Sequence, residues 1–274
     1  MTGGAAMETP EAWVYLCRIA APLGNGGGSE PRSLAEASDL LETSARVVPA
    51  PEVAISVATA SVRLDPARHL DQAWRSLSGA EAERAARFVK DSDRVRYVFG
   101  HAMLRLLLAR RLAAAPDAIA FATGPNGKPG LAGPGSRLAF NLSYGDGVVA
   151  LAFARRPVGI DLEAVRDNVR FSQIGRRFFQ PDEQRYLEAG TGSGVRDRFF
   201  RLWTRKEAVL KALGVGLSGL GEVSVLGDLV VADGAGGGAM RIALRTLPGP
   251  PGHALALAVE TNAGAGPILD HSYP

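Results

Sequence analysis

Residues 158–165 read Val-Gly-Ile-Asp-Leu-Glu-Ala-Val, and this stretch decides how the centre of the chain folds. Apolar and acidic residues alternate in it, which is typical of a strand with one buried face. Ile160 and Leu162 therefore point to one face, and Asp161 and Glu163 point to the other. Two carboxylates on one strand face, about 7 Å apart at their Cα atoms, repel each other unless a cation lies between them. The plain alternative is that both carboxylates simply face water.

Residues 196–213 have the strongest helical pattern in the chain, and Gly214 closes the helix. Trp203, Glu207 and Lys211 recur at intervals of four, so they lie along one side of this helix. Because Trp203 is a natural core residue, Glu207 and Lys211 are expected beside the buried seam. The alternative is a surface ion pair between them, which would stabilise the helix by a few tenths of a kcal/mol.

Three carboxylates from these two elements, Asp161, Glu163 and Glu207, suit a hard cation such as Mg²⁺ that is bound to phosphate oxygens. A zinc site is not expected, because the four histidines are widely spread and the single cysteine, Cys17, lies near the N-terminus. These residues therefore predict a site for Mg²⁺ and a phosphate-bearing ligand.

Local signals predict helices and strands in both halves of the chain. Ser78 precedes Glu81 by three residues, a capping box that opens a helix, and residues 145–147 separate two apolar runs as in a β-hairpin. The predicted helices cover residues 78–90, 91–113, 169–179, 181–188 and 196–213. The predicted strands cover residues 53–62, 138–143, 148–153, 158–165, 222–225, 230–232, 241–245 and 254–260.

These elements predict an α+β fold with two lobes, each a small antiparallel sheet packed with helices. The N-terminal lobe covers residues 51–155, and the C-terminal lobe, which carries the carboxylates, covers residues 156–261. Residues 1–50 include a glycine run and are predicted to be a partly disordered extension with at most a short helix. Residues 262–274 are predicted to be a loose tail.

Composition narrows the class of protein. The chain has 274 residues, 46% of them hydrophobic, which is enough for a sizeable core, and its formal net charge is only +3. One cysteine allows no internal disulfide, and no apolar run approaches the roughly 20 residues of a membrane span, so a cytoplasmic protein without membrane contact is expected. A nucleic-acid-binding function would rest on the basic isoelectric point alone, since no basic stripe with interleaved aromatic residues is present.

Two motifs together resemble a known family. Residues 159–163 (Gly-Ile-Asp-Leu-Glu), followed by residues 200–208 (Phe-Arg-Leu-Trp-Thr-Arg-Lys-Glu-Ala) and then Lys211, are similar to the signature pair of the 4′-phosphopantetheinyl transferases. Further matches resemble the larger, two-lobed, surfactin-synthetase-activating type of that superfamily. These matches are Arg87-Phe88 with Arg96, Gly127-Lys128-Pro129, Phe140-Asn141-Leu142-Ser143 and Arg177-Phe178-Phe179 ahead of Glu183. The similarity runs from about residue 77 to residue 217.

The resemblance implies two similar α+β lobes, related by a pseudo-twofold axis, with the active site between them. It implies transfer of the 4′-phosphopantetheine arm of coenzyme A to a serine of an apo acyl or peptidyl carrier protein, with release of 3′,5′-ADP. Coenzyme A is then the donor substrate, Mg²⁺ the cofactor, and the carrier protein the partner. A monomer is expected, because both lobes lie in one chain. Polyketide, nonribosomal-peptide and fatty-acid carriers all remain open as acceptors.

The resemblance also implies roles for particular residues. Asp161, Glu163 and Glu207 would hold Mg²⁺ against the pyrophosphate, and Lys211 would neutralise the charge of that pyrophosphate. Glu207, or a water that it orients, is the candidate general base. Phosphoryl transfer needs positioning and charge neutralisation more than covalent help, and this site is consistent with that demand.

The donor-binding residues are expected to be mostly cationic. The similarity implies that they are Arg84, Arg96, Lys128, Ser143, Tyr144, Lys206 and Lys211. Tyr144 is a departure, because the family usually has histidine after its Asn-x-Ser motif. Tyrosine can donate a hydrogen bond or stack on adenine but carries no positive charge, so donor affinity or its pH dependence is expected to differ.

Two other functions fit part of the pattern. A metal-dependent phosphohydrolase would need no protein acceptor, so an assay with and without a carrier protein separates it from a transferase. A non-catalytic carrier-binding module would have no use for clustered negative charge, and the three carboxylates argue against it.

Overall fold

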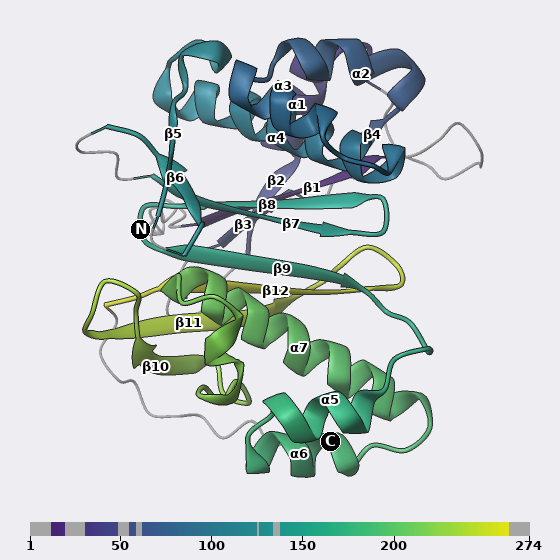
Figure 1. Ribbon diagram of the computed structural model, residues 1–274, viewed down its shortest axis with the longest axis vertical. Coiled ribbons are helices and arrows are strands. Elements are labelled where there is room, and N and C mark those ends of the chain that lie inside the picture. The colour runs from purple at the N-terminus through teal and green to yellow at the C-terminus, as the bar shows by residue number, and fades with distance from the viewer. Residues whose placement is uncertain are drawn as a thin grey trace, which may run out of the picture.

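The computed structural model describes residues 12–19, 31–48, 55–58, 62–124, 126–133 and 138–262. Its elements stack in four layers, in the order helices, sheet, sheet, helices (Figure 1). Three groups of buried hydrophobic residues fill the spaces between successive layers. The fold is therefore α+β, as the sequence predicted.

The first sheet is built around a strand from the beginning of the chain. Its order is β2-β3-β1-β8-β7, and β4 pairs with the other end of β1. Strand β1 runs antiparallel to β8 but parallel to β3 and β4, so this sheet is mixed and not purely antiparallel as predicted. The strands are β1 (Ala12–Ile19), β2 (Ala45–Val48), β3 (Ile55–Ala58), β4 (Val62–Leu64), β7 (Ala139–Gly145) and β8 (Val148–Ala154).

The prediction for residues 1–50 differs from the structure. Within them, β1 lies inside the first sheet and its Cys17 is fully buried. Helix α1 (Leu34–Ser44) packs on the same lobe and buries Leu41. Residues 1–11, 20–30, 49–50 and 263–274 lie outside the described residues, so the predictions of partial disorder and of a loose tail are not tested there. The single strand predicted over residues 53–62 corresponds to two short strands, β3 and β4.

Helices cover the outer face of the first sheet. They are α1, α2 (Pro66–Arg75), α3 (Gly79–Ala86) and α4 (Asp91–Leu112). The capping box of α3 is confirmed, because the hydroxyl of Ser78 accepts from the Glu81 backbone N–H and the Glu81 carboxylate accepts from the Ser78 backbone N–H. Helix α2 was not predicted, although Asp65 caps it and Pro66 occupies its first position, both common start signals.

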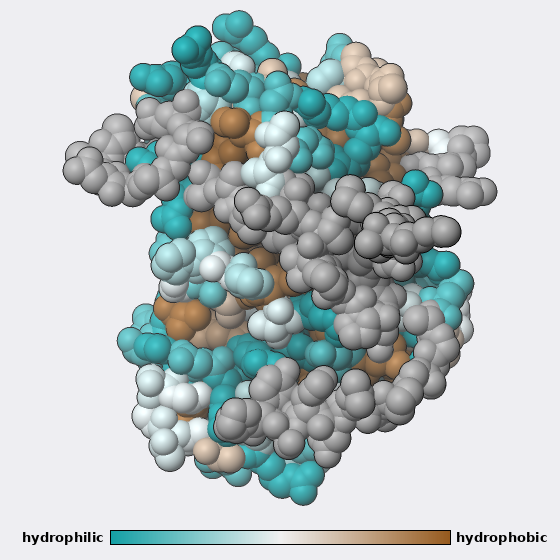
Figure 2. Space-filling model, turned by 180° about the vertical axis from the view of Figure 1, so that it is seen from behind, coloured by the Kyte–Doolittle hydropathy of each residue, from teal (hydrophilic) through white to brown (hydrophobic). Residues whose placement is uncertain are grey.

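Strand β8 is buried on both faces, since it lies between a helical layer and the second sheet. Leu151 and Phe153 pack toward the helices, whereas Ala150 and Ala152 pack toward the second sheet. Small side chains on that inner face let the two sheets stack closely. From behind, the outer helices expose mainly hydrophilic side chains, and hydrophobic side chains show beside the sheets (Figure 2).

The second sheet is antiparallel throughout, in the order β10-β11-β12-β9. Its strands are β9 (Val158–Ala164), β10 (Leu229–Asp233), β11 (Ala239–Leu247) and β12 (His253–Glu260). Its outer face packs on α7, which α5 and α6 flank (Figure 1). These helices are α5 (Phe171–Phe178), α6 (Pro181–Glu188) and α7 (Ser193–Leu213). The strand predicted over residues 222–225 does not form.

Smaller elements complete the described chain. A two-stranded ribbon of β5 (Phe121–Thr123) and β6 (Pro129–Leu131) follows the short 3₁₀ helix η1 (Pro116–Ala118), and a second 3₁₀ helix, η2 (Leu217–Gly221), follows α7. Of the helices in the described part of the chain, none combines the length and the apolar composition that crossing a bilayer requires.

Candidate active site

Helix α7 lies directly against β9, and a glycine makes this approach possible. A Cβ atom on Gly159 would lie only 2.0 Å from the carbonyl oxygen of Ala208. Any other residue at this position would push the helix away from the strand. The alternation of β9 is as predicted, because Ile160 and Leu162 enter the core between the two sheets. Asp161 and Glu163 therefore point to the side on which α7 lies.

Asp161 is the centre of the candidate site. Its carboxylate is buried and forms an ion pair with the Lys211 ammonium, with 2.6 Å between Lys211 Nζ and Asp161 Oδ1. The hydroxyl of Ser143 donates to the same oxygen at 3.0 Å. The other oxygen, Oδ2, is buried and has no hydrogen-bond partner. A buried carboxylate oxygen without a donor is costly, which suggests that a ligand belongs there.

Glu163 and Glu207 lie within electrostatic reach of Asp161. Burial raises the pKa of Glu207 to about 7, and the negative charges of Asp161 and Glu163 add to the rise while Lys211 opposes it. Burial and the charge of Asp161 also raise the pKa of Glu163, against a hydrogen bond from Trp203. The three acids thus gather around one ammonium group, and their negative charge is only partly neutralised.

Metal ligation by Asp161, Glu163 and Glu207 stays a prediction. Among the residues that the structure describes, no group of three or more His, Cys, Asp or Glu side chains is arranged to hold a metal ion. The Lys211 ammonium supplies the positive charge next to Asp161. The excess of negative charge and the partnerless Oδ2 of Asp161 are nevertheless the properties that a hard cation would satisfy.

Strand β7 contacts β9 through side chains. Asn141 Oδ1 accepts a hydrogen bond from the Ile160 backbone N–H at 2.8 Å, and Ser143 Oγ accepts one from the Leu162 N–H at 3.1 Å. The hydroxyl of Ser143 is thus used within the protein, and its predicted contact with the donor stays a prediction. No role was predicted for Asn141, although the Asn-x-Ser spacing on a strand places it on the same face as Ser143.

Lys128 belongs to a clasp at the end of α7. Its ammonium donates to the carbonyls of Val158 and Lys211, and Asn126 donates to the carbonyl of Gly214. Burial lowers the pKa of Lys128 to about 8. Beneath this clasp lies a cavity of about 260 Å³. Its polar lining comes from Asn126, Lys128, Asn141, Glu207 and Lys211.

The other predicted donor residues form a separate group on the helical side of β7. Tyr144 packs under α4, where a Cβ on Gly100 would lie 2.6 Å from its hydroxyl, and burial raises the pKa of that hydroxyl, which has no hydrogen-bond partner. Arg84 and Arg96 lie near enough to influence the same pKa. Arg96 pairs with Asp93. Strand alternation therefore directs Tyr144 and its neighbour Ser143 to opposite faces.

The prediction of Lys206 as a donor-binding residue is corrected by the structure. Lys206 points into the core between α7 and α6, where it pairs with Glu183 at 2.8 Å, and neither side chain has exposed surface. Its ammonium also donates to the carbonyls of Leu220 and Val223. One position along a helix is a turn of about 100°, so Lys206 and Glu207 face different sides of α7.

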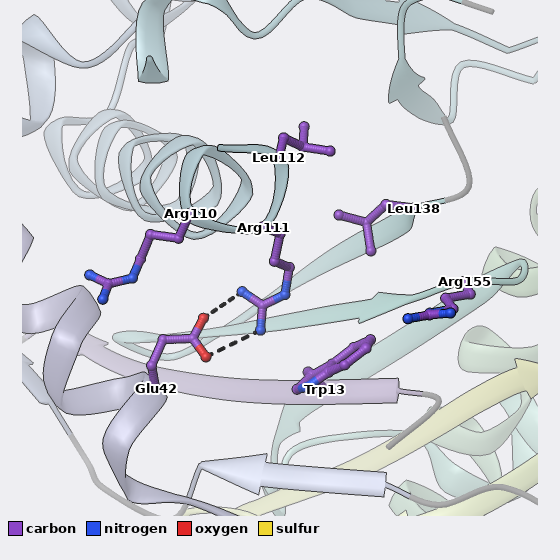
Figure 3. Close-up of a pocket in the computed structure, with 7 residues that line it drawn as sticks. All are labelled: Trp13, Glu42, Arg110, Arg111, Leu112, Leu138 and Arg155. Atoms are coloured by element: carbon purple, nitrogen blue, oxygen red, sulfur yellow. Dashed lines mark hydrogen bonds and ion pairs between the residues drawn. The ribbon is translucent and has the colours of Figure 1, made fainter. Parts of the chain in front are cut away.

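A larger cavity, of about 670 Å³, lies in the first lobe and involves none of the predicted site residues (Figure 3). The guanidinium of Arg111 bonds to Glu42 there and lies over the ring of Trp13, while Arg155 extends from the end of β8. These contacts hold α1, α4 and β1 together, and they place no carboxylate cluster in this cavity. The carboxylates suited to chemistry therefore lie at β9 and α7.

Comparison with known proteins agrees with the resemblance seen in the motifs. Residues 157–245 match the family model described as 4′-phosphopantetheinyl transferase superfamily, and residues 65–156 match the one described as 4′-phosphopantetheinyl transferase, N-terminal. Together these segments contain both motifs, β7 and the whole candidate site.

Curated relatives bear the same name. The chain is 36% identical to a putative 4′-phosphopantetheinyl transferase of Synechocystis sp., over 52% of this chain and 59% of that protein, which is under two thirds of its length. It is 35% identical to 4′-phosphopantetheinyl transferase HetI of Nostoc sp., over 58% of this chain and 69% of that protein. It is 32% identical to 4′-phosphopantetheinyl transferase Sfp of Bacillus subtilis, over 52% of this chain and 62% of that protein.

Proposed function

The chain belongs to the 4′-phosphopantetheinyl transferase superfamily, and from this premise we propose that it loads a carrier protein. In the proposed reaction the serine hydroxyl of an apo acyl or peptidyl carrier protein attacks the β-phosphorus of coenzyme A. A new P–O bond forms, the bond to the other phosphate of the pyrophosphate breaks, and 3′,5′-ADP leaves. The serine proton passes to a base.

The observation that carries this proposal is the meeting of Asp161, Glu163, Glu207 and Lys211, of which Glu207 and Lys211 line a cavity. They come from β9 and α7, and the crossing at Gly159 brings the two elements together. A site of this charge pattern can bind a pyrophosphate through an intervening cation. We propose Mg²⁺ for that cation, with Asp161, Glu163 and Glu207 as the residues that would hold it. When bound, Mg²⁺ would supply Lewis-acid stabilisation of the phosphate charge.

The side chains have distinct proposed tasks. Lys211 neutralises negative charge on the pyrophosphate, since its ammonium is already held at the cluster. Glu207, or a water that it orients, accepts the serine proton. Arg84 and Arg96 bind the donor from the helical side of β7, where their charges act on Tyr144. Lys128, which lines the cavity, contributes its positive charge to binding of the donor. A monomer that works in the cytoplasm stays a prediction from the sequence.

The test is intact mass spectrometry of an apo carrier protein incubated with the chain, Mg²⁺ and coenzyme A. We expect the carrier protein to gain the mass of one phosphopantetheine arm, and Asp161→Ala to abolish that gain while the protein stays folded. Glu222→Ala, which removes an exposed acid of the same lobe, is the matched control and should load normally.

Two results would count against the proposal. If 3′,5′-ADP appears at the same rate without a carrier protein, the chain is a hydrolase. If loading persists in Asp161→Ala, the carboxylate cluster is not the site of the reaction.

A further inference from the structure

The peptide backbone next to Asp161 is held from outside its own sheet. Strand β9 is the last strand of the second sheet, so one of its edges has no neighbouring strand in that sheet. On this edge lie the N–H groups of Ile160 and Leu162, the two residues that flank Asp161. Both N–H groups donate to side chains of β7 in the first sheet, namely Asn141 and Ser143.

These two contacts are buried, and they supply the hydrogen-bond acceptors that a neighbouring strand would otherwise provide. A buried backbone N–H without an acceptor destabilises a fold by about 1–3 kcal/mol, so each acceptor matters. Ser143 has a second link to the site, because its hydroxyl also donates to Asp161. Asn141 acts on the backbone of Ile160, and its amide stands at the wall of the cavity that Glu207 and Lys211 also line.

Residue Ile160 is fixed from both of its peptide groups. Its N–H is bound by Asn141 of β7, and its carbonyl accepts from the Lys211 ammonium at 3.2 Å. The same ammonium binds the carboxylate of Asp161. The orientation of the Asp161 side chain therefore depends on two successive peptide groups, the first held by Asn141 of the first lobe and the second by Lys211 of α7.

We propose that Asn141 is a positioning residue for Asp161, and that it sets the geometry of the carboxylate by holding the Ile160 peptide. This inference rests on the proposed function, because the geometry matters for the transfer of phosphopantetheine. A misplacement of about 1 Å in a reacting site can lower a rate by about 100-fold. Loss of the Asn141 contact should therefore appear in kcat more than in the KM for coenzyme A.

The test compares Asn141→Leu with Leu142→Ala. Leucine at position 141 keeps nearly the same size but cannot accept a hydrogen bond. Leu142→Ala removes packing of the same strand on the first core while leaving the contact to Ile160 in place. Asn141→Ser, whose side chain is too short to reach Ile160, is a second variant in case leucine at this position prevents folding.

Two measurements give independent answers. Amide hydrogen exchange by NMR should show the Ile160 N–H exchanging at least about 10-fold faster in the Asn141 variants, because the N–H has lost its acceptor. Carrier-protein loading should show kcat lower by about 10- to 100-fold, with the KM for coenzyme A within about threefold. Leu142→Ala should keep the kcat of the unaltered protein at a temperature where all variants are folded.

Each contrary result has a definite meaning. An unchanged kcat in both Asn141 variants overturns the proposal, and so does an equal loss of kcat in Leu142→Ala, which would make the effect one of stability. A higher KM with unchanged kcat would show that Asn141 binds the donor instead. If the unaltered protein loads no carrier protein, the proposed function fails, and hydrogen exchange at Ile160 still reports whether Asn141 holds the strand.

Discussion

Two lysines of α7 form ion pairs with carboxylates at similar distances but in very different surroundings. Lys206 pairs with Glu183 at 2.8 Å, and Lys211 pairs with Asp161 at 2.6 Å. In the first pair every charge is satisfied, because Glu183 also accepts from the backbone N–H groups of Gln180 and Val225. In the second pair one oxygen of Asp161 has no partner, and further acids lie nearby.

The difference teaches which pair is structural and which is suited to chemistry. A fully paired, fully buried charge has no capacity left for a ligand, whereas a cluster with excess charge beside a cavity does. Both lysines lie on the same helix, so residue type alone does not separate the two pairs. Their surroundings do.

The largest expected effect comes from breaking the structural pair. Lys206→Met would leave the Glu183 carboxylate buried without its countercharge, and we expect the free energy of unfolding to fall by about 3–5 kcal/mol. Urea denaturation measures this directly. A loss under about 1 kcal/mol would mean that water reaches Glu183, and the contrast between the two pairs would disappear.

A substitution among the acids around Lys211 should raise the stability instead of lowering it. Glu207→Gln removes one of the negative charges gathered around Lys211, so in metal-free buffer at pH 8 it should raise the free energy of unfolding by about 1 kcal/mol. The same variant should load a carrier protein about 100- to 1,000-fold more slowly, since one of the groups that stabilise the reacting phosphate through the proposed cation is lost. A destabilised but active Glu207→Gln would reverse this assignment.

Glu81 extends the comparison to the first lobe with an effect on stability that depends on pH. Burial alone would raise its pKa, but hydrogen bonds from His101, Ser78 and Arg105 lower it to about 2. Since the pKa is lower in the folded protein than the usual 4.5, Glu81 stabilises the fold above about pH 4.5. That contribution, about 3 kcal/mol at most, is lost as the pH falls toward 2.

The measurement for Glu81 is the free energy of unfolding between pH 7 and pH 3. Glu81→Gln should show a flatter pH dependence than the unaltered protein over this range. Identical slopes for the two proteins would show that Glu81 has an ordinary pKa and is not held as firmly as Glu183.

Much of the fold was predictable because local patterns determine it. The alternation in β9, the hairpin of β7 and β8, and the helix that ends at Gly214 all follow from spacing, and the structure contains each of them. The α+β class follows from these elements together. For the site, Asp161 and Lys211 were both predicted to belong to it, and they contact each other, whereas their roles stay predictions.

The rest depends on contacts between segments far apart in sequence. The direction of β1 relative to β3 and β4 has no local signal, and residues 12–19 are separated from their partners by long connections. Lys206 and Glu207 are adjacent, and only the packing of α6 shows that Lys206 is structural. The role of Asn141 depends on a strand of the other sheet, so it was visible only in three dimensions.

The position of β1 also has a consequence for biosynthesis. Tyr15 pairs with Leu151, so β1 must remain without its antiparallel neighbour until β8, more than 130 residues later in the chain, has been translated. During that interval the nascent chain carries an exposed, sheet-forming apolar segment, which is a natural target for chaperones and for aggregation. The yield of active protein should therefore depend on the pace of translation up to β8.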